Sequence, residues 1–331
     1  MAKTHAGNAA PRRLQVEYMT RTERVQAAVN GAEVDRVPVC FWHHFQPEGS
    51  GRAMAEATLR FFDDEYDLDI AKVMPDIPYP FPKKSISTVE DWRLFEPIDP
   101  LRSRYFRERA EAVAVLRDAL GFDTPVIMTV FSPLAEAMYA AKDRDQFLAQ
   151  MQENPVVVHE ALGIIADNLA AHLRDIIAAG ADGVFFALQG CTRTIMTEQQ
   201  YREFGRPYDL LALRGASSGW LNILHVHGEK DLMFDMALDY PVQVLSWSDR
   251  IAGPSLREAR VKTSKCLMGG WNEFGALHKG PEDQIEAEAR DAIAQTGGRK
   301  FILANGCSVP DDTDPRWLEA ARAIAEELPV G

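Results

Sequence analysis

The feature that most constrains the fold is an alternation of short apolar segments with longer helical segments along the 331-residue chain. Apolar, β-branched-rich runs bounded by turn residues are typical of buried strands. The predicted strands are 36–42, 69–74, 125–131, 180–188, 221–228, 242–247, 266–271 and 300–305. Strands that are apolar on both faces belong to parallel sheets covered by helices, and eight βα units close into a barrel. We therefore predict a single (β/α)₈ TIM barrel over residues 20–331, preceded by a short, flexible N-terminal extension, residues 1–19.

Local signals mark where the intervening helices begin. Thr20 followed three residues later by Glu23 is a capping-box pattern, so a helix is expected there. Asp314 before Pro315 is the expected N-cap of the last helix, since proline suits the first helical turn. The predicted helices are 20–30, 53–65, 104–120, 134–141, 145–152, 155–179, 198–214, 280–297 and a last one from 315.

Composition limits the class of partner and the compartment. Lys and Arg number 36 against 49 Asp and Glu, which gives a net charge of −13. An acidic chain without a basic cluster argues against nucleic acid or an anionic membrane as the main partner. We find no membrane-spanning apolar run and no apolar signal-peptide core. Four widely spaced cysteines, Cys40, Cys191, Cys266 and Cys307, do not form a disulfide framework, so a cytoplasmic protein is expected.

The segment 221–228 carries the strongest chemical signal. Side chains alternate along a strand, so His225 and His227 point to the same face. Two imidazoles at the end of a buried strand offer two ligands to a metal ion, and Cys307, just after strand 300–305, offers a third. Histidine and cysteine are the ligands that zinc prefers. We predict that these three residues bind zinc; the competing interpretation is a hydrogen-bonded histidine pair and a buried structural cysteine.

Polar residues at the ends of the other strands are further candidates, because barrel active sites lie at the C-terminal ends of the strands. The candidate catalytic residues are Asp76, His44 and Asp249, and the candidate substrate-binding residues are Trp42, His43, Tyr79, Gln189 and Asn272. His43 and His44 face opposite ways, so at most one points into the barrel mouth. For Asp249 the alternative role is to cap the following helix.

Two further sets of residues are left with alternative roles. Cys191, at the end of the fourth strand, is a rival ligand to Cys307, although a buried structural role is favoured. Cys40 and Cys266 lie within strands and are assigned to the core. Aromatic residues that would suit a pocket for an aromatic or methoxylated substrate, or would equally be plain core, are Trp42, Phe45, Tyr79, Phe81 and Trp271.

From about residue 20 to residue 328 the chain resembles the uroporphyrinogen decarboxylase superfamily of (β/α)₈ barrels. The motifs that carry the resemblance are Glu23-Arg24-Val25, Asp35-Arg36-Val37-Pro38-Val39, Phe131-Ser132-Pro133-Leu134, His225-Val226-His227-Gly228, Asn305-Gly306-Cys307-Ser308-Val309-Pro310 and Asp311-Asp312-Thr313-Asp314-Pro315. Together they are specific for the superfamily rather than for one branch of it.

Two branches of the superfamily are compared. The decarboxylases have an arginine-rich loop after the first strand, whereas residues 41–48 contain no arginine, and Asn305-Gly306-Cys307 replaces their Gly-His-Gly. Only Asp76 matches their pyrrole-binding aspartate. The zinc-dependent methyltransferases carry His-x-Cys on the fifth strand and a cysteine after the eighth; His225 and Cys307 match this pattern. His227 departs from it, which makes the expected metal site more Lewis acidic than a two-thiolate site and puts thiol activation in doubt.

The resemblance to the methyltransferase branch implies a zinc-dependent methyltransferase or demethylase. It would move a methyl group from a small methylated substrate or a methylcorrinoid to a zinc-activated thiol or another acceptor. The implied cofactors are Zn²⁺ and a corrinoid or tetrahydrofolate as methyl carrier. A corrinoid protein is the implied partner, because the chain has no cobalamin-binding segment of its own; a homo-oligomer is left open. The fourth zinc ligand is also open, with Asp76, Asp249 and Glu273 as candidates.

Three other functions remain open. One is a decarboxylase acting on a small carboxylated or aromatic substrate, and another is a metal-assisted hydrolase in the same pocket. The third is a barrel that binds a corrinoid or tetrapyrrole without catalysis. Fold-level similarity does not decide between them.

Overall fold

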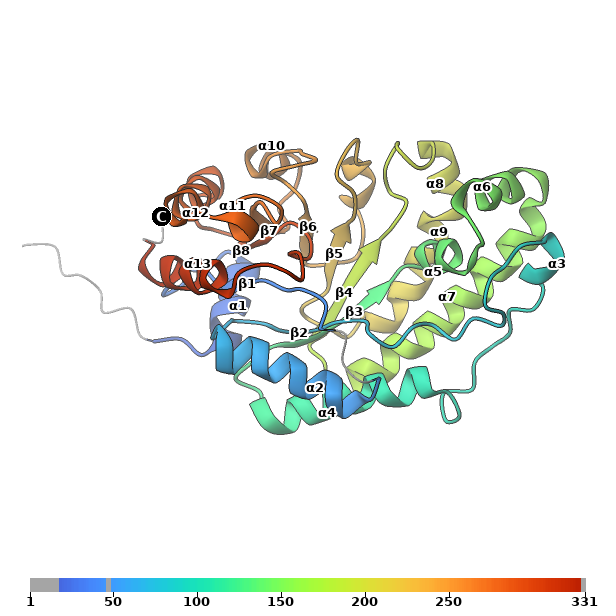
Figure 1. Ribbon diagram of the computed structural model, residues 1–331, viewed down its shortest axis with the longest axis horizontal. Coiled ribbons are helices and arrows are strands. Elements are labelled where there is room, and N and C mark those ends of the chain that lie inside the picture. The colour runs from blue at the N-terminus through green and yellow to red at the C-terminus, as the bar shows by residue number, and fades with distance from the viewer. Residues whose placement is uncertain (1–17, 46–48, 329–331) are drawn as a thin grey trace, which may run out of the picture.

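The computed structural model describes residues 18–45 and 49–328, and in them the predicted eight-stranded parallel barrel is confirmed (Figure 1). The strand order is β1-β8-β7-β6-β5-β4-β3-β2, so from β2 to β8 each strand pairs with its sequence neighbour, and β8 pairs with β1. The strands are β1 Val39–Cys40, β2 Ala71–Val73, β3 Val126–Phe131, β4 Gly183–Leu188, β5 Ile223–Val226, β6 Val244–Trp247, β7 Cys266–Trp271 and β8 Phe301–Asn305. Nearly all of the predicted extension, residues 1–19, lies outside the described residues.

Asp69 joins β1 to β2, the two strands that share no ladder. Its backbone N–H donates to the carbonyl of Val39 at 2.9 Å, and its carboxylate accepts the Val39 N–H at 2.7 Å. The same carboxylate is paired with Arg24 at 2.7 Å and with Arg36 at 2.5 Å. Arg24 also pairs with Asp35 at 2.6 Å. Two of the motifs that carry the family resemblance therefore form a buried ion-pair network that closes the barrel.

Helices surround the strands, and most begin where the local signals indicate. The side chain of Thr20 accepts the backbone N–H of Glu23, so the predicted capping box is present, and Asp314 caps the last helix as predicted. The α-helices are α1 Arg21–Asn30, α2 Gly51–Leu59, α3 Val89–Trp92, α4 Arg104–Leu120, α5 Pro133–Ala140, α6 Arg144–Glu153, α7 Pro155–Ala178, α8 Glu198–Phe204, α9 Arg206–Leu213, α10 Leu256–Lys262, α11 Ala276–Lys279, α12 Glu282–Thr296 and α13 Pro315–Glu327. A π-helix, η1 Arg60–Glu65, and two 3₁₀ turns, η2 Arg214–Ala216 and η3 Phe234–Ala237, complete the elements.

Several predicted elements differ in extent from the observed ones. The strand predicted at 36–42 pairs only at Val39–Cys40. The helix predicted at 198–214 is two helices that meet at Gly205, because Pro207 has no N–H to continue the hydrogen bonding of α8. The helix predicted at 53–65 ends as η1, and α3, α10 and α11 are additional elements.

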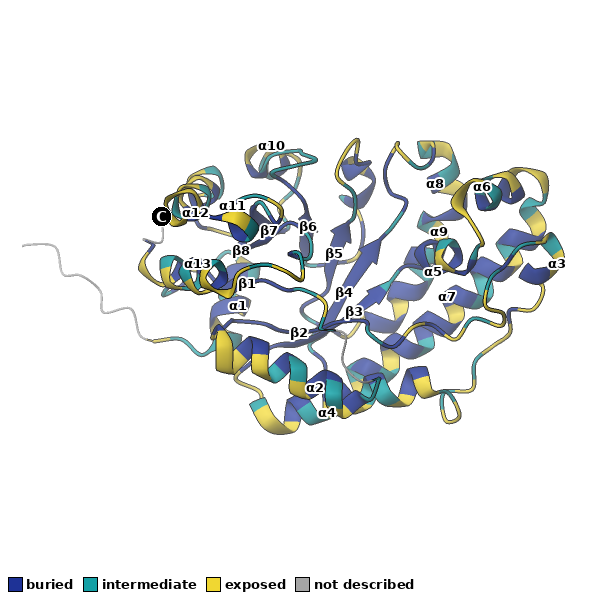
Figure 2. Cartoon of the chain, in the orientation of Figure 1, coloured by how far each residue is buried: buried dark blue, intermediate teal, exposed yellow. Residues whose placement is uncertain are grey.

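Two clusters of buried apolar residues fill the structure. Figure 2 shows that the strands are buried and that the surrounding helices are exposed on one side. Strand residues that face the barrel interior, such as Ile127, Ile223 and Ile302, pack with one another. Their neighbours along the strands, such as Leu224 and Leu303, pack outward against the helices. Because side chains alternate along a strand, this division places every second residue of β5, including His225, inside the barrel.

Helix α7 is long and apolar enough to cross a membrane by length and composition alone. Most of its apolar residues are buried against neighbouring elements of the barrel, among them Leu162, Ile165 and Leu169. A single such helix is what the core of a large α/β fold contains, so we describe α7 as a core helix.

Candidate metal centre

The three residues predicted to bind zinc meet at the C-terminal end of the barrel. His225 lies in β5, His227 follows the strand, and Cys307 follows β8. Their ligand atoms all lie within 4.8 Å of one another, and the sulfur of Cys307 is 3.6 Å from Nδ1 of His227. Strands β5 and β8 are separated by β6 and β7 in the sheet, so only the curvature of the barrel brings these residues together.

The donor set fits a zinc ion. Zinc–nitrogen and zinc–sulfur bonds of about 2.0–2.3 Å place tetrahedral donors about 3.3–3.7 Å apart. The pair Cys307–His227 already has this separation, and the third donor requires a movement of at most about 1 Å from the 4.8 Å limit. Three protein ligands leave a fourth position for a substrate, as in catalytic zinc sites.

Burial sets the protonation of the three ligands. It lowers the pKa of His225 well below the ordinary value, with further contributions from His227 and Lys72, and it lowers the pKa of His227 as well. Both imidazoles are therefore neutral at pH 7 and have a lone pair for a metal. Nδ1 of His225 lies 3.3 Å from the hydroxyl of Ser246, which leaves its Nε2 for a ligand. Burial raises the pKa of the Cys307 thiol to about 11.

A cavity of about 200 Å³ adjoins the three ligands. Aromatic side chains, polar loop residues and the three candidate metal ligands form its walls. The lining residues are Trp42, His44, Lys72, Met74, Pro75, Thr129, Phe131, Tyr139, Phe185, Ala187, Gln189, His225, His227, Cys307 and Ser308. Of the residues predicted from sequence, Trp42, His44 and Gln189 are thus placed beside the candidate ligands.

Lys72 is a site residue that the sequence analysis missed. It lies in β2, and its ammonium group is buried in the barrel interior, 2.8 Å from the hydroxyl of Thr129 and 3.1 Å from the sulfur of Met74. A signal was visible in the sequence, because residues 70–74 read Ile-Ala-Lys-Val-Met and Lys72 is the one charged residue in that run. Alternation places it on the same face as Ile70 and Met74, toward the barrel interior.

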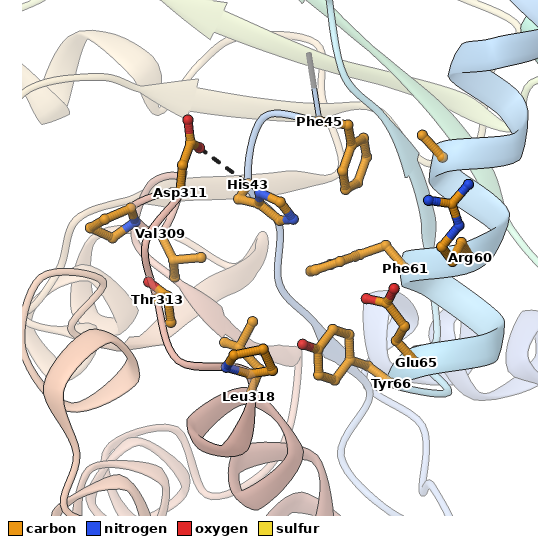
Figure 3. A pocket seen from close by; sticks show the side chains of 13 residues that line it. His43, Phe45, Arg60, Phe61, Glu65, Tyr66, Val309, Asp311, Thr313 and Leu318 are labelled. Atoms are coloured by element: carbon orange, nitrogen blue, oxygen red, sulfur yellow. Dashed lines mark ion pairs between the residues drawn. The ribbon is translucent and has the colours of Figure 1, made fainter. Parts of the chain in front are cut away.

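The histidine pair after β1 divides between two cavities, as the predicted opposite orientation requires. His44 lines the cavity beside the metal ligands, and its Nδ1 is 3.6 Å from Asp76. His43 lines a second cavity of about 340 Å³ between η1, the loop after β8 and α13, where it packs against Phe45 and Phe61 (Figure 3). The structure therefore does not bring His43 together with the metal ligands.

Asp249 and Asn272 are also placed outside the cavity. Asp249 is buried and accepts the backbone N–H of Gly270 at 2.9 Å, so it joins β6 to β7. The side chain of Asn272 accepts the backbone N–H of Phe274 at 3.0 Å and stabilises the turn after β7. Both side chains satisfy local backbone groups, which is a common role for Asp and Asn beside a strand end.

Tyr79 and Trp271 pack behind the barrel wall. The hydroxyl of Tyr79 accepts a hydrogen bond of 2.8 Å from Asn168 in α7, and the indole N–H of Trp271 donates to the carbonyl of Ile285 at 3.1 Å. Neither lines the cavity beside the candidate metal ligands; their rings belong to the layer between strands and helices.

Of the carboxylates considered as a fourth ligand, Glu273 lies against Gly306, the residue before Cys307, and is not part of the three-donor cluster. One of its oxygens accepts a hydrogen bond of 2.5 Å from Ser248. The other is buried without a hydrogen-bond partner and is so close to Gly306 that a Cβ there would lie 2.8 Å from it. Burial raises the pKa of Glu273 to about 7. Because Gly306 has no side chain, the Glu273 carboxylate can approach the backbone immediately before Cys307.

The rival cysteine is not part of the cluster. Cys191 is buried, its thiol faces the carbonyl of Met233 at 3.8 Å, and burial raises its pKa to about 12. Cys40 and Cys266 are buried within β1 and β7, as predicted.

Comparison with known sequences places the chain in a family. Residues 65–328 match the uroporphyrinogen decarboxylase family (URO-D). The chain belongs to this family. A uroporphyrinogen decarboxylase of Nocardia farcinica is 30% identical over 279 residues, which cover 79% of this chain and 73% of that protein.

The relatives with known sequences and solved structures also include methyltransferases. A methylcobamide:CoM methyltransferase of Methanosarcina barkeri is 25% identical over 233 residues, which cover 70% of this chain and 66% of that enzyme. The match thus spans slightly under two thirds of the methyltransferase. A solved methyltransferase from Methanosarcina mazei superposes with a TM-score of 0.74 at 21% identity, covering 93% of this chain and 99% of that one. This likeness establishes the shared barrel fold.

Proposed function

We propose that the protein is a zinc-dependent methyltransferase or demethylase of the uroporphyrinogen decarboxylase family. The observation that carries the proposal is the convergence of His225, His227 and Cys307, with their ligand atoms within 4.8 Å, at the wall of a small aromatic cavity. The similarity to a methylcobamide:CoM methyltransferase supports the same reaction class. The methyl group would come from a small methylated substrate or a methylcorrinoid, with a corrinoid protein or tetrahydrofolate as carrier, in the cytoplasm.

When bound, zinc would supply a Lewis acid that lowers the pKa of a thiol or another soft nucleophile at its open position. The protein's own residues prepare the site for this chemistry. The neutral imidazoles of His225 and His227 present lone pairs, and Ser246 orients the first of them. The rings of Trp42 and Phe185 form part of the cavity wall.

A proton can be held at the rim of the cavity. The carboxylate of Asp76 faces Nδ1 of His44 at 3.6 Å, so the proton of a neutral His44 is favoured on that nitrogen. The other imidazole nitrogen of His44 is then free to accept a proton from the methyl acceptor. We assign this pair a proton-transfer role at the cavity mouth.

The cavity favours methyl transfer over decarboxylation of a tetrapyrrole. A substrate with several carboxylates needs several cations, and arginine is the residue that pairs best with them. The only cationic side chain of Lys or Arg type that lines the described cavity is Lys72, and the loop 41–48 has no arginine. A volume of about 200 Å³ is also small for such a ligand, since drug-sized ligands occupy pockets of about 300 Å³ or more.

The metal site is tested by elemental analysis of protein purified without chelators. We expect about one zinc per chain in wild type, a ratio set by the single three-donor cluster among the described residues. The variants His227→Ala and Cys307→Ala should lose the metal, whereas His227→Cys, which restores a zinc donor, should retain it. Cys191→Ala is the matched control, because it removes a cysteine outside the cluster. Zinc retained in both alanine variants, or absent from wild type, would overturn the site.

The reaction class is tested on the zinc-loaded protein with methylcobalamin and a thiol, followed by the change in the corrinoid absorbance spectrum. We expect demethylation that depends on His225 and is lost in His227→Ala. Methylated aromatic substrates are tested in parallel by detection of the demethylated product. If a zinc-containing protein demethylates none of these but hydrolyses or decarboxylates aromatic acids and esters, the methyltransferase assignment is wrong and the metal site stands.

A further inference from the structure

Lys72 places a buried positive charge inside the barrel without a carboxylate partner. Its side chain is almost fully buried, and no described Asp or Glu forms an ion pair with it. An ammonium group has three N–H donors. Two of them face the Thr129 hydroxyl and the Met74 sulfur, the second being a weak acceptor. No hydrogen bond from the third donor to a described residue is present, and Lys72 lines the cavity.

Burying an ammonium group without a counter-ion destabilises its charged form. Desolvation lowers the pKa of Lys72 to about 7, and the groups that oppose this shift, Cys40, Cys307 and Asp76, act only at longer range. Of these, Asp76 faces Nδ1 of His44 at 3.6 Å. An anion that enters the cavity would provide the missing counter-charge, and a charge-assisted hydrogen bond is roughly twice as strong as a neutral one.

Aromatic rings define the shape of the space next to this cation. The ammonium group lies 4.2 Å from the ring centre of Phe185 and 4.7 Å from that of Trp42. Phe131 and Tyr139 line the same cavity. Flat apolar walls around one cationic donor are complementary to an aromatic ring that carries a single negative group.

We propose that Lys72 anchors the carboxylate of a small aromatic acid in the cavity that Trp42 and Phe185 line on the side of the ammonium group. This inference rests on the proposed function, because it names the substrate class of the same site: the ring occupies the aromatic walls and its methylated substituent faces His225, His227 and Cys307. Lys72 is then a specificity-determining residue that selects a singly charged substrate.

The test compares two ligands of the same shape and different charge. Binding of 4-methoxybenzoate and of the uncharged 4-methoxybenzamide is measured by ligand-observed NMR or calorimetry at pH 6.5, without turnover. Wild type should bind the carboxylate at least about tenfold more tightly than the amide. The variant Lys72→Met, which keeps the length of the side chain and removes its charge, should bind the two ligands equally.

Two control variants test whether the preference belongs to Lys72 itself. Lys265 is a half-buried lysine just before β7, at the end of the barrel opposite the cavity, and it donates to the carbonyls of Tyr240 and Val242. The variant Lys265→Met should keep the preference for the carboxylate. His227→Ala disrupts the metal site; preference for the carboxylate should persist there if Lys72 is the anchor. Thermal melting confirms that each variant is folded.

The outcomes distinguish this inference from the proposed function. If wild type shows no preference for the carboxylate, or if Lys72→Met keeps it, the anchor role is overturned whether or not methyl transfer is found. If His227→Ala loses the preference while Lys72→Met keeps it, the metal site binds the carboxylate instead. If the preference depends on Lys72 but no methyl transfer occurs, the substrate class stands and the reaction must be reassigned.

Discussion

The ammonium group of Lys72 lies where an apolar side chain would be more stable. The interior residues that surround it are apolar, and its hydroxyl partner Thr129 does not neutralise its charge. Such a group is retained in a barrel when it serves a ligand, because sites that bind charged substrates commonly reduce the stability of the fold.

This gives a stability prediction for Lys72→Met. The pKa of Lys72 is lowered in the folded protein from 10.5 to about 7. When a pKa is lower in the folded state, the free energy of unfolding is highest above the pKa of the unfolded state and decreases as pH falls through the pKa of the folded state. At pH 6, Lys72 is therefore charged in the folded protein, and the full cost of burying that charge lowers the stability. We expect the variant to be more stable than wild type at pH 6, by on the order of 2 kcal/mol after the lost contact with Thr129. Urea unfolding measures this; a lower midpoint for the variant would contradict it.

Among the elements, α8 and α9 are joined to the segment around η3 by one buried carboxylate. Asp209 in α9 accepts hydrogen bonds from the hydroxyls of Tyr201 at 2.7 Å and Tyr240 at 2.9 Å. Its second oxygen is buried without a partner. The break at Gly205, which the sequence analysis did not foresee, is what turns α9 so that this cluster can form.

Burial raises the pKa of Asp209 from 3.8 to about 7, which predicts a pH-dependent stability. When a pKa is higher in the folded state, its contribution to stability is fully present below the pKa of the unfolded state and is lost as pH rises through the pKa of the folded state. Asp209→Asn mimics the protonated acid, so its stability relative to wild type should rise by on the order of 3 kcal/mol between pH 5 and pH 8. Urea unfolding at both pH values tests this. A difference that is the same at both would show that Asp209 does not titrate in this range.

For the molecule as a whole, closure of the barrel depends on Asp69. The two strands at the ends of the sheet order, β1 and β2, are joined by its backbone and side chain, and its carboxylate neutralises two buried arginines. The family motifs near the N-terminus therefore stabilise the fold rather than the site, since they lie at the end of the barrel opposite the cavity. Removing one partner of a buried ion-pair network leaves the others uncompensated.

We expect Asp69→Asn to reduce the free energy of unfolding by about 3–5 kcal/mol, because Arg24 and Arg36 lose their shared counter-ion. Asp63→Asn is the matched control. Asp63 pairs with Arg21 at the surface at 2.7 Å, and its loss should cost less than about 1 kcal/mol. Chemical unfolding of the three proteins tests the comparison, and equal effects of the two substitutions would refute a special role of Asp69 in closure.

Local periodicity was enough to predict the elements that depend on neighbouring residues alone. The eight apolar segments, the capping box at Thr20 and the N-cap at Asp314 follow from short-range rules, and all are found. Alternation along a strand was enough to place His225 and His227 on one face. Strand and helix ends were predicted less well, as at β1 and Gly205, because a single proline or a lost ladder partner sets where pairing stops.

Which strand ends meet, and what surrounds each polar group, depended on the assembled barrel. Cys307 reaches His227 because the sheet curves through β6 and β7, a long-range closure that no local pattern encodes. Asp249 and Asn272 lie outside the cavity, because their side-chain oxygens accept hydrogen bonds from nearby backbone N–H groups. Lys72 is a charged residue in an apolar strand. Its proposed role as a substrate anchor could be inferred only from its spatial neighbours, which are aromatic rings and not carboxylates. The energy of a polar group is set by its burial and its partners, and both come from residues that are distant in the chain.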